Sequence, residues 1–134
     1  MELQIIPTIQ TDRAWLDGAS CLSEACDKSG GEITGSQLKM ILSRGERTLI
    51  RMWDGEVRGW GVVRVDQLPN IRVLFITDLV AHNGGFQNFF EEIKQLARDL
   101  GCSKIRCAAG KAQERLYRSL CGFKSVYNIL EVDS

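Results

Sequence analysis

The sequence from residue 71 to residue 80 reads Ile71-Arg-Val-Leu-Phe-Ile-Thr-Asp-Leu-Val80 and is apolar at most positions. Such a run is expected of a central strand that is buried on both faces of a sheet. The turn Leu68-Pro69-Asn70 precedes it, and a loop at residues 81–85 follows it. Residues 86–100 then place apolar side chains at the 3.6-residue spacing of an amphipathic helix, which Gly101 ends.

A short strand at Lys104–Ala109 follows this helix. Two strands joined by a helix form a parallel pair when they are neighbours in one sheet, because the helix crosses back over the sheet. We therefore predict that Ile71–Val80 and Lys104–Ala109 are parallel neighbours.

The residues before 71 predict antiparallel strands. Glu2–Ile6 and Arg47–Trp53 are β-prone, and Asp54-Gly55 is a strong hairpin signal that leads into a strand at Glu56–Asp66. Gly59 and Gly61 lie on one face of that strand, and two glycines so placed indicate a bulge or a close approach of another segment.

Three further helices and a last strand complete the chain. A helix at 11–26 has an apolar stripe, and a shorter one runs from Ser36 to Leu42. The third helix is expected at Ala112–Leu120 and the last strand at Phe123–Val132. The fold class is therefore α/β (mixed α+β), with one domain at residues 1–134 and a mainly antiparallel mixed sheet that carries helices on both faces.

Composition excludes some classes of function. The chain has 134 residues, with 17 basic and 17 acidic side chains, so its charge gives no reason to expect nucleic acid or a membrane as partner. The five cysteines form no C-x-x-C pair. We interpret them as buried thiols in a reducing compartment, and we predict no disulfide and no metal site. We find no signal peptide and no apolar run long enough to span a membrane, and we expect a cytoplasmic protein.

The segment Ala112-Gln-Glu-Arg-Leu-Tyr-Arg-Ser-Leu-Cys-Gly-Phe123, together with the order of elements from Ile71 to Val132, resembles the GNAT superfamily of N-acetyltransferases. The resemblance implies an acyl-CoA-dependent N-acyltransferase with acetyl-CoA as cofactor. It also implies that the cofactor lies beside the strand 71–80 and the helix 86–100, with its pyrophosphate on backbone N–H groups of the loop between them.

This resemblance implies a set of cofactor-binding residues at the end of the strand and the beginning of the helix: Leu79, Val80, Gly84, Gly85, Phe86 and Gln87. A helix N-terminus suits phosphate because its first N–H groups are unpaired and carry a partial positive charge. The loop here reads only Ala81-His82-Asn83-Gly84-Gly85, shorter than the family's loop and without its Arg or Gln. We therefore expect CoA to bind weakly or not at all. The glycine pair fits a tight strand-to-helix turn equally well.

Two residues are the catalytic candidates. Tyr117 matches the family's tyrosine that protonates the departing thiolate, and a phenol's pKa is near that of the thiol it would serve. Asp78 lies near the end of the strand and could accept the amine's proton, as could the sole histidine, His82, through water. The alternatives are that Tyr117 packs against the sheet, that Asp78 caps the next loop, and that His82 is a surface residue.

Two surface features have alternative interpretations as well. Lys111, Arg115 and Arg118 form a basic stripe on one helix, which suits phosphate groups or is ordinary solvated surface. Trp53 and Trp60 lie on the two arms of the hairpin, where they pair, mark a partner-binding face or belong to the core.

Two functions therefore stay open. The first is N-acetyl transfer from acetyl-CoA to an amine on a small molecule or a protein, by direct attack on the thioester. The second is a catalytically silent GNAT-like module that binds a protein partner or serves a structural role, in the manner of small virion-associated proteins of bacteriophages. In a silent module, Phe86 or Phe89 would fill the groove where the two parallel strands part.

Overall fold

The structure is a computed structural model that describes residues 1–82 and 85–134. It contains one five-stranded sheet in the order β1-β2-β3-β4-β5. The strands are β1 (Glu2–Ile6), β2 (Thr48–Trp53), β3 (Val57–Gln67), β4 (Arg72–Ala81) and β5 (Lys104–Cys107). Neighbours are antiparallel except β4 and β5, which are parallel. The predicted parallel pair and the mainly antiparallel mixed sheet are confirmed.

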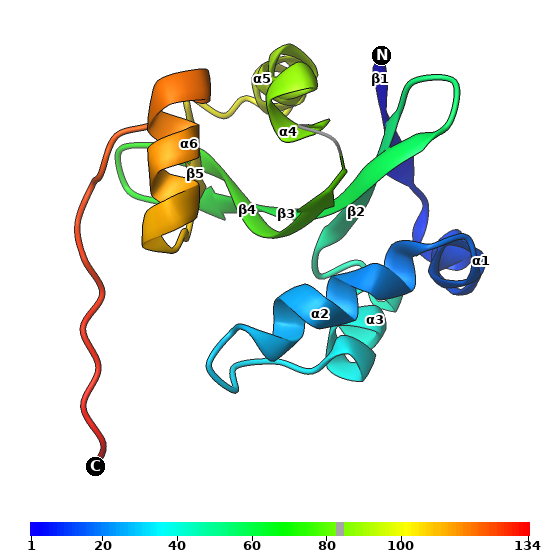
Figure 1. Cartoon of the computed structure of the whole chain (residues 1–134), viewed down its shortest axis with the longest axis horizontal. Helices are drawn as coiled ribbons and strands as arrows, with labels where there is room; N and C mark the ends of the chain where they lie inside the picture. The colour runs from blue at the N-terminus through cyan, green and yellow to red at the C-terminus, as the bar shows by residue number, and fades with distance from the viewer. Residues whose placement is uncertain (83–84) are drawn as a thin grey trace.

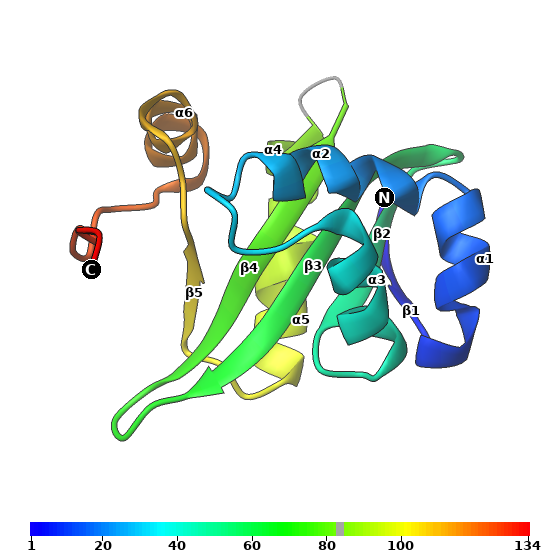
Figure 2. The same ribbon diagram turned by 90° about the horizontal axis from the view of Figure 1, so that it is seen from below.

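Helices cover both faces of the sheet, as predicted (Figures 1 and 2). The helices are α1 (Thr11–Leu16), α2 (Leu22–Asp27), α3 (Gly35–Ser43), α4 (Gly85–Asn88), α5 (Phe90–Asp99) and α6 (Lys111–Cys121). Helices α1 to α3 pack on one face, and α4 and α5 pack on the other, with α6 beyond β5 (Figure 1). Among the described residues, no helix is both long enough and apolar enough to cross a membrane.

Two of the predicted helices are broken. The helix expected at 11–26 is interrupted at Gly18, whose φ of +130° is open to glycine but strained for other residues. A Cβ at Gly18 would lie 3.3 Å from the indole nitrogen of Trp60, so the chain turns there to pass over that ring. The helix expected at 86–100 is divided at Phe89, between α4 and α5.

The core has one hydrophobic cluster on each side of the sheet. Leu22, Leu38 and Trp60 belong to the cluster under α2 and α3, and Leu74 and Ile93 belong to the cluster under α5. Trp60 is buried, which confirms the core interpretation for that residue.

The two hairpin tryptophans do not face each other directly. The register of β2 and β3 places Arg51 opposite Trp60 and Val57 opposite Trp53. The guanidinium carbon of Arg51 lies 5.6 Å from the ring centre of Trp53 and 5.7 Å from that of Trp60, within cation–π range of both.

A bulge in β4 decides which way its last residues face. Val62 of β3 is opposite Asp78, and Val63 is opposite Ile76, so Thr77 is an extra residue with no partner in β3. One extra residue exchanges the faces of all that follow it. Ile76 accordingly belongs to the cluster under α5, whereas Asp78 faces α2.

The parallel pairing of β4 with β5 ends just before the bulge, at Ile76 and Cys107. β5 is therefore shorter than the predicted 104–109. In the part of the chain that the structure describes, β4 continues to Ala81 with β3 on one side and no strand on the other. The two parallel strands thus leave an opening between their carboxyl ends.

The last predicted strand is wrong. Residues 123–132 pair with no strand and leave α6 as an extended segment, which we call the C-terminal arm (Figure 1). Its beginning is bonded to α6 instead: Phe123 donates its N–H to the Tyr117 carbonyl, and Ser125 bonds Glu114 and Arg118. These contacts direct the arm past the sheet, toward the side that carries α2 and α3 (Figure 1).

Candidate functional site

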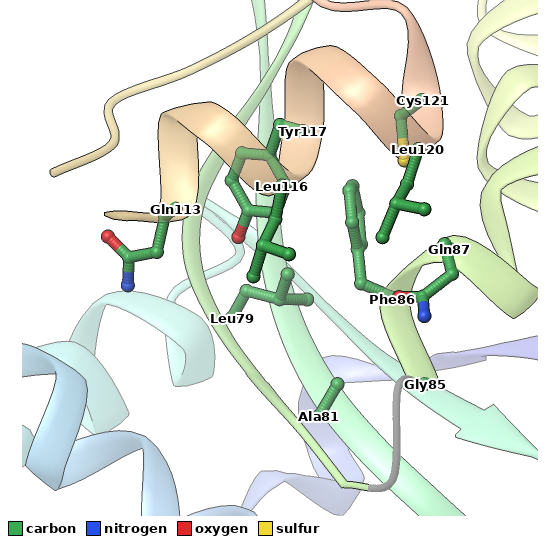
Figure 3. Close-up of a pocket in the computed structure, with 10 residues that line it drawn as sticks. All are labelled: Leu79, Ala81, Gly85, Phe86, Gln87, Gln113, Leu116, Tyr117, Leu120 and Cys121. Carbon is green, nitrogen blue, oxygen red and sulfur yellow. The ribbon is translucent and has the colours of Figure 1, made fainter. Parts of the chain in front are cut away.

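A cavity of about 230 Å³ lies at the opening between β4 and β5 (Figure 3). Three elements line it: Leu79 and Ala81 at the end of β4, Gly85, Phe86 and Gln87 of α4, and Gln113, Leu116, Tyr117, Leu120 and Cys121 of α6. It forms here because the strand pairing stops at Ile76, and α4 and α6 cover the gap from one face.

The end of β4 directs backbone polar groups into this opening. The N–H of His82 donates to the carbonyl of Arg58 on β3 at 2.9 Å. Antiparallel pairs alternate between residues that bond their partner strand and residues that point away from it. Because His82 bonds β3, Ala81 before it points away, Val80 bonds β3 again, and Leu79 points away. Ala81 and Leu79 therefore direct their N–H and C=O groups toward the open edge.

Aromatic rings fill part of the same gap. The ring of Phe86 lies 5.0 Å from that of Tyr117 and 6.4 Å from that of Phe123, between centroids. Phe123 in turn lies 5.5 Å from Phe90. Phe86 is only 5% exposed, and its ring points up from α4 toward α6 (Figure 3). Tilted aromatic pairs at such separations are attractive, so this cluster holds α6 over the cavity.

Tyr117 reaches the cavity from the middle of α6. Burial raises the pKa of its phenol above the ordinary value of 10.0, and the nearby thiols of Cys107 and Cys121 add to the increase. The hydroxyl is protonated at neutral pH, as an ordinary phenol is, and the raised pKa makes it a weaker acid.

Asp78 lies on the other side of the sheet from α6. Its Oδ2 accepts a hydrogen bond from Thr77 Oγ1 at 2.8 Å and lies 3.7 Å from Arg47 Nη1. The thiol of Cys26, on α2, donates to Oδ1 at 3.9 Å. Asp78 makes these contacts because the bulge turns its side chain toward α2. Both carboxylate oxygens are therefore engaged by protein groups.

A larger groove of about 1180 Å³ connects the two sides through the opening. Asp78, Val80 and Tyr117 all line it, together with the α2–α3 segment. Of the residues expected to bind the cofactor, the structure gathers Leu79, Gly85, Phe86 and Gln87 in the smaller cavity. Val80 lines only the larger groove, and Gly84 lies outside the described residues.

The first residue of α4 is closely packed. The N–H of Gly85 donates to the carbonyl of His82 at 3.0 Å, and a Cβ at Gly85 would lie 3.2 Å from the Cβ of Ala81. Glycine at position 85 thus has a packing reason of its own. The side chain of His82 is exposed and lines neither cavity.

The predicted basic stripe is reduced by local bonds. Arg118 pairs with Glu114 at 3.0 Å and donates to Ser125 Oγ at 2.6 Å. Lys111 and Arg115 are exposed on the same helix.

Sequence reasoning missed most of the wall that α6 contributes. Gln113, Leu116, Leu120 and Cys121 follow one helical face with Tyr117 at their centre. The 3.6-residue spacing around Tyr117 was the signal that could have found them.

No metal centre is formed by the described parts of the chain: residues 1–82 and 85–134 contain no group of three or more metal-binding side chains. The five cysteines are free thiols.

No family model matches the sequence, and no curated protein sequence matches it either. Solved structures do match, over nearly the whole chain. A possible acetyltransferase from Clostridium difficile 630 superposes with a TM-score of 0.70 at 15% identity, covering 99% of this chain and 97% of that one. A ribosomal-protein-alanine N-acetyltransferase from Brucella melitensis biovar Abortus 2308 gives 0.69 at 10% identity, covering 99% and 100%.

An aminoglycoside acetyltransferase from an uncultured soil metagenomic sample gives a TM-score of 0.67 at 13% identity, covering 99% of this chain and 96% of that one. These neighbours are acetyltransferases, and at such low identity the likeness is one of fold. The chain therefore has the mixed α/β fold of these acetyltransferases, the GNAT fold.

Proposed function

We propose that this chain is a GNAT-like acyl-CoA-dependent N-acyltransferase whose reaction takes place at the opening between β4 and β5. One observation carries the proposal. The ring of Tyr117 enters the same cavity as Leu79, whose backbone groups point toward the open edge of β4. A proton donor and a polar backbone edge thus converge on one space, as acyl transfer requires.

The residues fit the acyl end of the cofactor better than its phosphates. Acetyl-CoA, when bound, supplies an acyl group on a thioester, which passes to an amine as the C–N bond forms and the C–S bond breaks. The backbone N–H of Leu79 would polarise the carbonyl oxygen. Tyr117 holds a proton at its Oη for the released sulfur. Asp78, engaged by Arg47 and Thr77, would assist the amine's proton loss only through water in the larger groove.

Phosphate binding would be weak. The loop lacks the family's Arg or Gln, and Arg118 is engaged by Glu114 and Ser125. A charge-assisted hydrogen bond contributes roughly 1.5–3 kcal/mol. Losing two of them would weaken binding by on the order of a hundredfold or more.

Calorimetry with acetyl-CoA at low and moderate salt tests the proposal. We expect a weak, salt-dependent heat of binding, since exposed Lys111 and Arg115 would interact with phosphate through solvent. Thiol release in the presence of a panel of amines measures turnover. If no heat is detected at millimolar acetyl-CoA and no thiol is released, the proposed enzymatic function is rejected.

Tyr117→Phe separates catalysis from binding. The variant keeps the ring that stacks on Phe86 and removes only the hydroxyl, so we expect turnover to fall at least tenfold while the affinity for CoA changes little. Phe123→Leu, which alters the same cluster without touching a hydroxyl, is the matched control. Unchanged turnover in Tyr117→Phe would remove the phenol from the mechanism.

The second candidate is a silent binding or structural module, including a virion component. The packing of Phe86 favours it, because its ring fills part of the gap and the cavity between α4 and α6 is smaller than the roughly 300–1,000 Å³ of common ligand sites. Phe86→Ala tests it in the same calorimeter. If the ring blocks the site, the variant will bind CoA more tightly than the wild type; if the ring supports the site, it will bind more weakly.

A further inference from the structure

The first helix of the chain turns one face inward and the other outward. A 3-10 turn at Thr8–Gln10 leads directly into α1, so the two form one helical stretch. Thr11 and Ala14 are buried, and Trp15 packs partly against the cluster under α2 and α3. The remaining positions of the helical period therefore face outward.

This outward face carries two apolar side chains with two charges between them. Ile9 and Leu16 are 90% and 83% exposed, and no other large apolar side chain of the described residues before the C-terminal arm is as exposed. Seven residues separate them, which is close to two helical turns, so they share a face. Asp12 and Arg13 lie between them on that face. In both views, α1 is at the end of the molecule opposite α6 (Figures 1 and 2).

Neither charge is held by a buried partner. Asp12 Oδ1 lies 2.9 Å from Lys39 Nζ. Arg13 Nε lies 3.2 Å from Asp17 Oδ1. The side chains of Asp12 and Arg13 nevertheless remain 87% and 77% exposed. Exposed pairs of this kind contribute little stability, so both groups are able to take a second partner of opposite charge.

We propose that two copies of this chain form a symmetric dimer in which the outer faces of the two α1 helices pack antiparallel. A twofold axis that passes between Asp12 and Arg13 places Ile9 of each copy against Leu16 of the other. It also places Asp12 of each copy opposite Arg13 of the other. One face thus supplies both halves of every contact, apolar against apolar and acid against base, and this self-complementarity identifies a second copy as the partner.

Parallel packing of the same faces lacks this match. It would place each side chain opposite its own equivalent, so that Asp12 would meet Asp12 and Arg13 would meet Arg13. Like charges repel, and only the apolar contacts would remain favourable. The order of the four residues along the helix therefore also sets the relative direction of the two helices.

The contact is small, so we expect a weak dimer. It removes the side chains of Ile9 and Leu16 from water in both copies, and it leaves the charged groups partly hydrated. Small interfaces have low affinity because association carries an entropic cost of its own, and we expect a dissociation constant of about 10 µM to 1 mM. The candidate site lies at the opposite end, beside α6, so association should leave the binding of acetyl-CoA unchanged (Figure 1).

Sedimentation over a concentration series that spans this range tests the dimer. We expect Leu16→Asp to raise the dissociation constant at least about tenfold, because the twofold axis places a carboxylate against Ile9 at two contacts. Leu68→Asp is the matched control, since Leu68 is an exposed leucine at the turn between β3 and β4 and should leave the dimer intact. A wild type that stays monomeric at the upper end of the range overturns the proposal, and so does a dimer that Leu16→Asp leaves unchanged.

Charge variants test the direction of packing without relying on the leucine. Asp12→Arg and Arg13→Asp should each weaken self-association severalfold, because each places like charges opposite one another. Mixing the two variants in equal amounts should restore a dimer that contains one chain of each kind, since acid then faces base at both contacts. Thermal unfolding near the wild-type temperature shows that both variants are folded, as expected for exposed side chains. If neither variant weakens the dimer, or if the mixture associates no more tightly than each variant alone, the antiparallel contact is wrong.

Discussion

Asp78 shows how one backbone position decides a side chain's role. If Thr77 were regularly paired instead of forming the bulge, Asp78 would share the face of Ile76 and lie near the cavity of Tyr117. With the bulge, it faces α2 and forms an ion pair with Arg47. The sequence places Asp78 near the end of the strand, but it contains no signal for the bulge, so the direction of the carboxylate was beyond prediction.

The Arg47–Asp78 pair is expected to matter for stability. Arg47→Met would leave a buried carboxylate with Thr77 and Cys26 as its remaining partners, and breaking a buried pair costs about 3 kcal/mol or more. Because Arg47 is partly exposed, we expect a loss of about 2 kcal/mol in urea unfolding. Adding Asp78→Asn should recover part of the loss. If the double variant is no more stable than Arg47→Met, the pair is not the cause.

Cys107 gives a prediction for alkaline pH. Burial, with a smaller contribution from Cys121, raises the pKa of its thiol from 9.0 to about 11 in the folded protein. The folded state therefore holds this proton more tightly, so the contribution is full below pH 9 and is lost as the pH rises from 9 to 11. Allowing for partial exposure, we expect about 1 kcal/mol. Cys107→Ala should show a smaller fall in unfolding free energy between about pH 8.5 and 10.5; an identical fall would contradict the assignment.

At the scale of elements, what could be predicted follows from periodicity. The hairpin at Asp54-Gly55, the helix α3 and the parallel pair β4 and β5 all have local signals, and all are present. The break at Gly18 depends on the distant ring of Trp60, and the last predicted strand is absent where the beginning of that segment is bonded to α6. Long-range contacts of this kind leave no trace in local spacing. For the site, the family resemblance identified Tyr117, which does line the cavity. Sequence spacing alone could not decide which phenylalanine ring packs against it.

Gly59 of β3 lies very close to β4, as the two glycines on one face of the strand predicted. A Cβ there would lie 2.6 Å from the carbonyl oxygen of Val80 and 2.9 Å from the Cα of Ala81, so β4 would have to move. We expect Gly59→Ala to destabilise the protein by about 2–3 kcal/mol. Gly61→Ala is the control: its Cβ would meet flexible side chains of Ile50 and Leu79 at 3.1–3.4 Å, and it should cost less than half as much. Equal losses in thermal unfolding would refute this reasoning.

At the scale of the whole molecule, the sheet divides the protein into two unequal halves. The face under α2 and α3 carries one core cluster, and the ion pair of Asp78 lies at its edge, beside the larger groove. The opposite face ends in the cavity, covered by short helices and an aromatic cluster.

Helix α6 has no buried residue, and its attachment rests mainly on Tyr117 and the rings around it. In hydrogen exchange, its amides should therefore open at a lower free energy than those of β3, as a separate unit of local unfolding. Because α6 forms one wall of the cavity, a ligand held there would slow exchange in α6 selectively, in proportion to its occupancy. Mass-spectrometric exchange with and without acetyl-CoA would show this protection. Uniform exchange across α6 and β3 would mean that the helix is as firmly held as the sheet, and that exchange in α6 does not report ligand binding.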